Sequence, residues 1–220
     1  MKLKIDLHVH TSYSDSNGLV YEIIREAERK GLDGLAITDH KTIRGVHEAL
    51  KICGELMIIP GQEVKTRRCE ILALGIRRRI KDDLPLLIAL KEIHAQNGLA
   101  VLPHPTVPLF RGLDEETIRA LPIDGIEVFS AITPLPGYFI RKNLRMARRL
   151  RKPIVAGSDS HSAETVGDAY TIISCEERSV DEVLRAIRLG RTSIGGAPSR
   201  LSFKLRMLGK TIPHILFGIH

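Results

Sequence analysis

Histidine and aspartate residues lie close together in the first forty residues of the chain. They form three groups, Asp6-Leu7-His8-Val9-His10-Thr11, Ser14-Asp15 and Thr38-Asp39-His40. His8 and His10 are two residues apart in a segment whose apolar residues alternate, as in a β-strand, so their side chains should point to the same face. Two neighbouring imidazoles at the end of a strand fill a core poorly and bind a metal ion well. The pair therefore predicts a metal site.

Further potential ligands follow other apolar segments, at points where strands should end. Glu63 follows the segment 56–60, His104 follows 99–103, and Asp159 and His161 follow 154–156. These donors are imidazole nitrogens and carboxylate oxygens without sulfur, a set that suits Zn²⁺, Mn²⁺ or Fe²⁺. The ligands are too numerous for one ion with an open position, so we expect two or three divalent metal ions.

Apolar segments alternate with helical patterns along the chain. The predicted strands cover 4–9, 34–38, 56–60, 70–76, 99–103, 124–129, 153–157 and 169–174, and the predicted helices cover 19–31, 42–53, 83–97, 114–120, 137–151 and 179–189. This alternation is typical of an α/β fold with parallel strands covered by helices, in an open sheet or a closed barrel. A closed, TIM-like barrel is favoured because the carboxyl ends of its strands meet at one rim, where all the potential ligands can converge.

The length and composition predict a protein of one domain in the cytoplasm, a reducing compartment. Of the 220 residues, 43% are hydrophobic and 27% are charged, and no apolar segment is long enough to span a bilayer. The first residues show no signal-peptide pattern, and the three cysteines, Cys53, Cys69 and Cys175, include no CxxC pair. The net charge of +7 favours an anionic partner, with a generally basic surface as the alternative explanation.

In combination, these residues resemble the PHP (polymerase and histidinol phosphatase) family of metal-dependent phosphoesterases. The motifs D-L-H-V-H-T, S-D, I-T-D-H, P-G-x-E, H-P and G-S-D-S-H occur in the order typical of that family, up to about Gly196. The resemblance implies a distorted (β/α)7 TIM-like barrel formed by residues 1–196. The apolar and basic tail, 197–220, would pack on this barrel.

The resemblance also implies a set of metal ligands. One metal would bind His8, His10, Glu63 and Asp159, a second would bind Asp15, His40 and His161, and a third would bind Glu63 and His104. Relatives often have a histidine in place of Glu70, which is therefore either a further ligand or a surface charge. Asp6 and Asp39 would orient ligand histidines.

The activity implied by the resemblance is hydrolysis of phosphate monoesters or diesters by a metal-bound hydroxide, with Asp159 and His161 as catalytic residues. TrpH/YciV-like members of the family imply nucleotides or short nucleic-acid ends as substrates, and no membrane partner is expected. The candidate phosphate-binding residues are Lys41, Arg67, Arg68, Arg111 and Arg141. The basic helix predicted at 137–151 could bind a nucleic-acid backbone. The alternatives are a histidinol-phosphate-type phosphatase and, in another class, a non-catalytic accessory or nucleic-acid-binding subunit.

Overall fold

The computed structural model describes residues 1–107 and 113–200 of the chain. Arg111 and the segment 201–220, which includes most of the predicted tail, lie outside the described residues. The strands are β1 (Lys2–Val9), β2 (Gly34–Ile37), β3 (Met57–Lys65), β4 (Glu70–Leu74), β5 (Leu99–Leu102), β6 (Gly125–Ser130), β7 (Ile154–Gly157), β8 (Ala169–Ser174) and β9 (Thr192–Gly196). The helices are α1 (Val20–Arg29), α2 (Arg44–Ile52), α3 (Leu86–His94), α4 (Glu115–Ala120), α5 (Pro136–Leu150), α6 (Val180–Arg188) and the 3₁₀ turn η1 (Ala163–Thr165).

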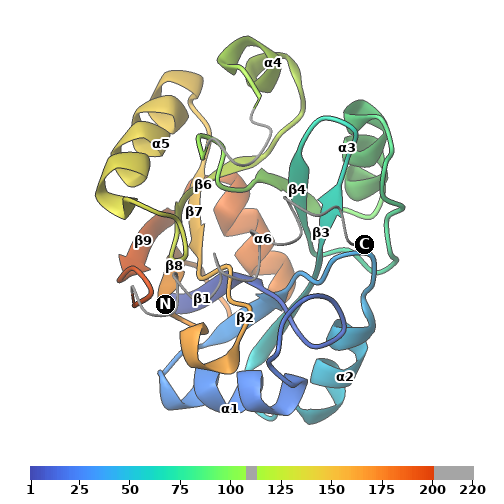
Figure 1. The fold of residues 1–220 in the computed structure, drawn as a ribbon, viewed down its shortest axis with the longest axis vertical. Coiled ribbons are helices and arrows are strands. Elements are labelled where there is room, and N and C mark those ends of the chain that lie inside the picture. Colours follow the sequence, from blue (N-terminus) through green and yellow to red (C-terminus); the bar gives the residue numbers. More distant parts are fainter. Residues whose placement is uncertain (108–112, 201–220) are drawn as a thin grey trace, which may run out of the picture.

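The strands form one sheet that curls into a nearly closed barrel (Figure 1). The order in the sheet is β7-β6-β5-β4-β3-β2-β1-β8-β9, and β7 also returns to the side of β1. There, the amide of Asp159 donates to the carbonyl oxygen of His8 at 2.8 Å, and the amide of His10 donates to that of Ser160 at 3.0 Å. The first seven strands therefore make the barrel, and β8 and β9 extend the sheet outside it. The predicted distorted, TIM-like barrel is confirmed.

One barrel strand, β4, runs against its neighbours. It pairs antiparallel with both β3 and β5, whereas the other pairs of neighbouring barrel strands in the sheet are parallel. A tight turn joins β3 to β4, in which the Thr66 hydroxyl donates to the carbonyl oxygen of Cys69 at 2.6 Å. The start of β4 therefore lies at the same rim as the carboxyl ends of the parallel strands.

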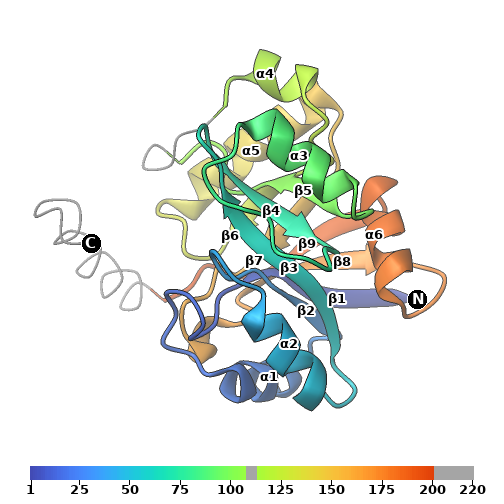
Figure 2. The ribbon, with the colours of Figure 1, turned by 90° about the vertical axis from the view of Figure 1, so that its right-hand side faces the viewer.

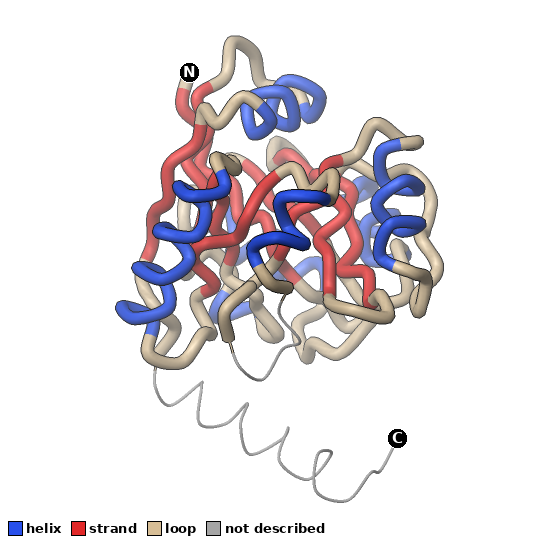
Figure 3. Tube along the Cα trace, turned by 90° about the horizontal axis from the view of Figure 1, so that it is seen from above, coloured by secondary structure: helices blue, strands red, loops and turns tan. Residues whose placement is uncertain are grey.

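Apolar side chains fill the barrel and the layer around it. The interior is packed by strand residues such as Ile5, Leu72 and Val101, together with Val183 and Ile187 of α6. Helix α6 thus closes the end of the barrel opposite the ligand-bearing rim. Figure 2 shows α1 and α2 on one side of the sheet and α3, α4 and α5 on the other, and Figure 3 shows helices surrounding the strands. None of the described helices is long and apolar enough to cross a membrane.

The structure corrects the sequence prediction in two places. The predicted strand 56–60 continues to Lys65, through Pro60-Gly61, which usually indicates a turn. Gly61 is needed inside this strand because a Cβ atom there would lie 3.0 Å from the carbonyl oxygen of Ile37 and 3.1 Å from that of Ala73. Strand β9 was not predicted because its Gly195-Gly196 segment lacks a strand pattern, and it forms by pairing with β8.

Candidate metal centre

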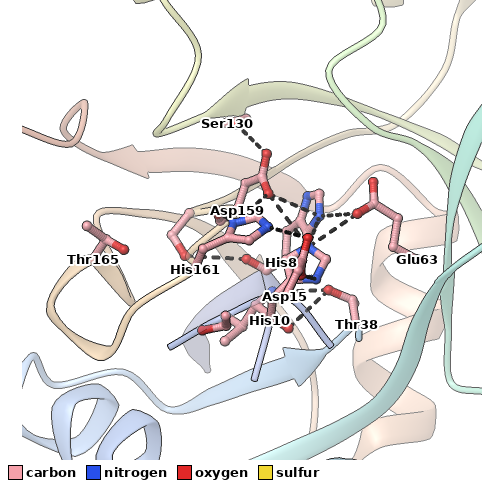
Figure 4. A network of polar contacts seen from close by, with 12 residues as sticks. His8, His10, Asp15, Thr38, Glu63, Ser130, Asp159, His161 and Thr165 are labelled. Carbon is pink, nitrogen blue, oxygen red and sulfur yellow. Dashed lines mark hydrogen bonds and ion pairs between the residues drawn. The ribbon is translucent and has the colours of Figure 1, made fainter. Parts of the chain in front are cut away.

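The rim at the carboxyl ends of the barrel strands brings the predicted ligands together (Figure 4). Each ligand lies in or directly after a different part of the barrel wall: His8 in β1, Glu63 in β3, and His104 and Asp159 after β5 and β7. The ion pairs and contacts described below connect all eight residues that the sequence predicted as ligands. They are His8, His10, Asp15, His40, Glu63, His104, Asp159 and His161.

A bulge in β1 directs its two histidines into the barrel. Relative to β2, β1 has one extra residue between Asp6 and Val9. Leu7 packs in the barrel interior, and Val9 packs on the outer layer against α1, so simple alternation would send His8 outward with Lys4 and Asp6. The extra residue lets both Leu7 and His8 face inward, which is how bulges commonly redirect side chains beside functional sites.

The first cluster consists of His8, His10, Glu63 and Asp159. The Nε2 atoms of the two histidines are 3.1 Å apart, and each lies 3.2 Å from Oε2 of Glu63. Oδ1 of Asp159 lies 3.5 Å from Nε2 of His8 and 3.6 Å from that of His10. The ligand atoms of His8, His10 and Glu63 lie within 4.8 Å of one another, so these three residues could hold one metal ion, with Asp159 beside them.

The second cluster consists of Asp15, His40 and His161, with His10 beside them. Oδ2 of Asp15 lies 3.3 Å from Nε2 of His161 and 3.6 Å from Nε2 of His40. Nδ1 of His10 faces Oδ1 of Asp15 at 3.6 Å. The side chain of Asp15 is 51% exposed, whereas the others are more buried, so this cluster opens toward the mouth of the barrel.

The third cluster consists of Glu63, Glu70 and His104. Nε2 of His104 lies 3.4 Å from Oε1 of Glu63 and 4.0 Å from Oε2 of Glu70. Glu70 reaches this position because β4 is antiparallel and therefore starts at the mouth. Glu63 belongs to the first and third clusters through its two oxygens, so it could bridge two metal ions.

Carboxylates and imidazoles in the clusters strongly shift each other's pKa values. Burial alone would raise the pKa of Glu63, but the imidazoles of His8, His10 and His104 hold it well below its usual range. Burial would lower the pKa of His161, but Asp15 and Asp159 raise it to about 9. Nδ1 of His10 and Oε1 of Glu63 are buried without a hydrogen-bond partner. Because such atoms are rarely left unsatisfied, both fit the role of metal ligands.

Glu127, which the sequence analysis missed, supports the first and third clusters from β6. Its side chain is fully buried, with Oε1 3.1 Å from Nδ1 of His8 and Oε2 accepting a hydrogen bond from the amide of His104 at 3.0 Å. A carboxylate only accepts hydrogen bonds, so Nδ1 of His8 carries the proton and Nε2 is left free for a metal. The available signal was a single acidic residue within the apolar strand Gly125–Ser130.

Asp6 and Asp39 position the backbone rather than the histidine rings. Asp6 accepts hydrogen bonds from the amides of Ser158 and Gly167, both at 2.8 Å, and so ties β1 to the segment that carries Asp159. Asp39 accepts from the amide and hydroxyl of Thr11, each at 2.7 Å, and so holds the loop that leads to Asp15. Asp6 also accepts a hydrogen bond from the backbone amide of His8 at 3.3 Å, so it contacts a ligand histidine through the main chain and not through the ring.

The backbone is strained where ligands leave the strands. His104 and Asp159 have positive φ angles of 29° and 55°, and Lys41, directly after His40, has a φ of 59°. Residues other than glycine rarely adopt this region, and such strain often accompanies functional sites.

Three of the candidate phosphate-binding residues lie at the mouth, and a fourth lies in α5. Lys41 follows a ligand, Arg67 and Arg68 lie in the turn between β3 and β4, and Arg141 lies near the start of α5, and all four are exposed. Nε of Arg67 donates to the carbonyl oxygen of Asp83 at 2.9 Å.

Comparison with known proteins identifies the family. Residues 6–100 match the model of the PHP domain, and residues 138–192 match the PHP-associated model. The chain is also 37% identical over 142 residues to the uncharacterized protein MJ1587 of Methanocaldococcus jannaschii, covering 59% of this chain and 82% of that protein. The chain belongs to the PHP family.

Other similar proteins include phosphoesterases. A phosphoribosyl 1,2-cyclic phosphate 1,2-diphosphodiesterase of Eggerthella lenta is 31% identical over 93 residues, which cover 39% of this chain and 34% of that enzyme. Among solved structures, a two-domain protein of Bacteroides vulgatus with a PHP-like metal-dependent phosphoesterase has a TM-score of 0.69 at 20% identity, with 90% of this chain and 65% of that chain covered. The lesion-specific endonuclease EndoQ of Pyrococcus furiosus has a TM-score of 0.67 at 18% identity, with 88% and 58% covered. These structural similarities show that the PHP barrel is a shared fold.

Proposed function

We propose that this PHP protein is a metal-dependent phosphoesterase that acts on nucleotides or the ends of short nucleic acids. The observation that carries the proposal is the convergence of three imidazole and carboxylate clusters at one mouth, two of which share Glu63. Membership of a family of metal-dependent phosphoesterases supports the reaction class. An accessory subunit without activity would have no need for so complete a set of ligands.

The proposed metal ligands are the eight residues of the mouth, with Glu70 as a ninth. Bound divalent cations would supply the Lewis acidity and the activated water that phosphoester hydrolysis requires. Nδ1 of His161 faces the backbone oxygen of Asp159 at 3.0 Å, which directs Nε2 of His161 toward Asp15 and the open side of the site. Nε2 of His161 cannot hold a metal ion and a proton at the same time. We therefore assign His161 the further role of transferring a proton from Nε2 to the leaving oxygen only in a form in which Asp15 and His40 would hold the second ion without it. Asp159 would fix the imidazoles of His8 and His10.

The surface charge favours a substrate with several phosphates. Helix α5 carries no acidic residue, and its exposed cations are Arg141, Lys142, Arg145, Arg148 and Arg149. Only Arg149 has an ion-pair partner, Glu115, among the described residues. Because like charges one helical turn apart repel each other, this helix would be stabilised by a polyanion. The exposed Lys41, Arg67, Arg68 and Arg141 would contact phosphates beyond the one that is cleaved.

Hydrolysis assays with matched substrates test the proposal. The purified protein, supplied with Mn²⁺ or Zn²⁺, should release phosphate from 3′,5′-bisphosphonucleosides or shorten 5′-phosphorylated oligonucleotides, and a chelator should stop the reaction. Preferential hydrolysis of histidinol phosphate would indicate the small-molecule phosphatase instead. Metal binding without hydrolysis of any of these esters would refute the proposed activity.

A further inference from the structure

The three clusters differ in their donor atoms, and the third cluster has the highest proportion of carboxylates. The first cluster combines two imidazoles with two carboxylates, and the second combines His40 and His161 with Asp15 and lies beside His10. In the third, Glu63, Glu70 and His104 offer two carboxylates and one imidazole, and their ligand atoms lie within 4.8 Å of one another. Carboxylates suit hard cations such as Mg²⁺ and Mn²⁺, whereas imidazoles suit Zn²⁺ and Fe²⁺.

We infer that Glu70 makes the third cluster selective for a hard divalent cation, Mn²⁺ or Mg²⁺, while the other clusters prefer Zn²⁺ or Fe²⁺. This inference rests on the proposed metal centre and extends it, because it assigns different ions to different positions. Glu70 is then a specificity-determining residue.

The surroundings of Glu70 are those of a ligand rather than of a surface charge. Its side chain is only 24% exposed, and no ion pair joins it to a lysine or arginine among the described residues, although Arg67 and Arg68 are close in sequence. The neighbouring acid is Glu63, which is 3% exposed. Two carboxylates this close and this buried repel each other unless a cation or a proton lies between them.

A buried oxygen atom without a hydrogen bond also indicates that a cation binds in the third cluster. Oε1 of Glu63 is buried and has no hydrogen-bond partner, and it is the oxygen that faces His104 and not the first cluster. The other oxygen of Glu63, Oε2, already lies 3.2 Å from both His8 and His10. The nearest charged neighbour of Oε1 is Nε2 of His104 at 3.4 Å, and a cation in the third cluster would contact an oxygen that has no hydrogen bond.

Metal-binding measurements test the inference without relying on activity. The intact chain is stripped of metal and titrated with Zn²⁺, with bound metal counted by elemental analysis after gel filtration. Mn²⁺ is then added and followed by electron paramagnetic resonance. We expect tight binding of two Zn²⁺ ions, a third Zn²⁺ bound at least about tenfold more weakly, and one Mn²⁺ bound in the presence of Zn²⁺.

Variants of Glu70 assign the Mn²⁺ signal to the third cluster. Glu70→Gln should abolish the Mn²⁺ site and keep two Zn²⁺ ions, whereas Glu70→His should bind the third Zn²⁺ at least about tenfold more tightly and Mn²⁺ more weakly. Glu92→Gln, which removes an exposed carboxylate from α3, is the control and should match the wild type. Thermal unfolding of each variant verifies that it is folded.

Four results would overturn the inference, and they differ in what else they refute. Three equally tight Zn²⁺ ions in the wild type, or a Mn²⁺ site that persists in Glu70→Gln, would show that Glu70 does not select the ion. Binding of no metal at all would refute the proposed metal centre as well. Two Zn²⁺ ions without a Mn²⁺ site would refute only the present inference.

Discussion

Replacing Glu127 by glutamine should weaken metal binding while leaving the fold intact. The two oxygens of Glu127 contact two donors, Nδ1–H of His8 at 3.1 Å and the amide of His104 at 3.0 Å. Glutamine has only one oxygen and must place its NH₂ group against one of these atoms. The backbone amide of His104 can only donate, but the imidazole of His8 can transfer its proton from Nδ1 to Nε2. We therefore expect the NH₂ group of the glutamine to face Nδ1 of His8. The ring proton of His8 would then occupy Nε2, the atom that should bind the metal.

The size of the effect follows from that change of tautomer. Loss of a carboxylate that orients a metal-bound histidine typically reduces metal affinity by about 10–100-fold, which corresponds to about 1.4–2.8 kcal/mol. The oxygen and the NH₂ group of the new glutamine both keep hydrogen-bond partners, so the free energy of unfolding of the metal-free protein should fall by no more than about 1 kcal/mol. The cost should appear in metal binding, not in folding.

Chelator competition and NMR together test this reasoning. Zn²⁺ affinity is measured against a chelator of known affinity. Burial would lower the pKa of His8, but Asp159, Glu63 and Glu127 hold it well above its ordinary value. Long-range ¹H–¹⁵N spectra of the metal-free protein are therefore recorded at a pH at which the imidazole is neutral, and they report which nitrogen of His8 carries the proton. Glu48→Gln is the control, because Glu48 accepts a hydrogen bond from the Tyr13 hydroxyl at 2.7 Å and is not one of the proposed ligands. A Glu127→Gln protein with Zn²⁺ affinity within twofold of the wild type, and with the His8 proton still on Nδ1, would refute the argument.

Four further predictions concern activity, stability, substrate binding and reactivity. His8→Ala and Asp159→Ala should each reduce metal-dependent hydrolysis by at least about 100-fold, equivalent to about 2.7 kcal/mol, and full activity in either variant would contradict the ligand assignment. Gly157→Ala should destabilise the protein by about 1–3 kcal/mol in urea unfolding, because the new Cβ atom would lie 2.4 Å from the Cβ atom of His8. Gly137→Ala in α5 is the control and should leave the free energy of unfolding unchanged, because its new Cβ atom would meet only a distant side chain. Replacing Arg141 and Arg145 by glutamate should weaken the salt dependence of single-stranded oligonucleotide binding. The slope of the logarithm of the binding constant against the logarithm of the salt concentration should fall in magnitude by about 1.4. The same change at Arg77 and Arg78, at the opposite end of the barrel, is the control and should leave that slope unchanged. Burial raises the pKa of the Cys69 thiol to about 11, so at pH 8 iodoacetamide should label the half-buried Cys53 well before Cys69. Labelling of Cys69, followed by mass spectrometry, should become faster as the pH approaches 11. Equal labelling rates of the two cysteines at pH 8 would contradict this prediction.

The position of potential ligands that follow apolar strands could be predicted, because the carboxyl ends of parallel strands lie at one rim of a barrel. That rule placed His104, Asp159 and His161 correctly from the sequence. It also made clear that a closed barrel was needed, since an open sheet keeps its outer strands apart. Simple alternation along β1 was less informative, because the bulge after Asp6 changes which residues face inward.

The roles of two acidic residues could not be predicted from the sequence. Glu70 is the first residue of its strand and joins the site only because β4 is reversed. The direction of β4 is set by its pairing with both β3 and β5 rather than by local residues. Glu127 lies within an apolar strand, and its role depends on His8, which is 119 residues away in the chain. Long-range pairings of this kind leave no periodic pattern to detect.

The seam between β1 and β7 has a consequence for synthesis of the protein. β1 is completed within the first ten residues, but its partners on one side, Ser158 to Ser160 and β8, are about 150 residues further along. At typical elongation rates, the ribosome needs roughly 10–30 s to add that length of chain. His8 and His10 are therefore translated well before Asp159, with which they form the first cluster. Assembly of that cluster would then be a late event in the synthesis of the protein.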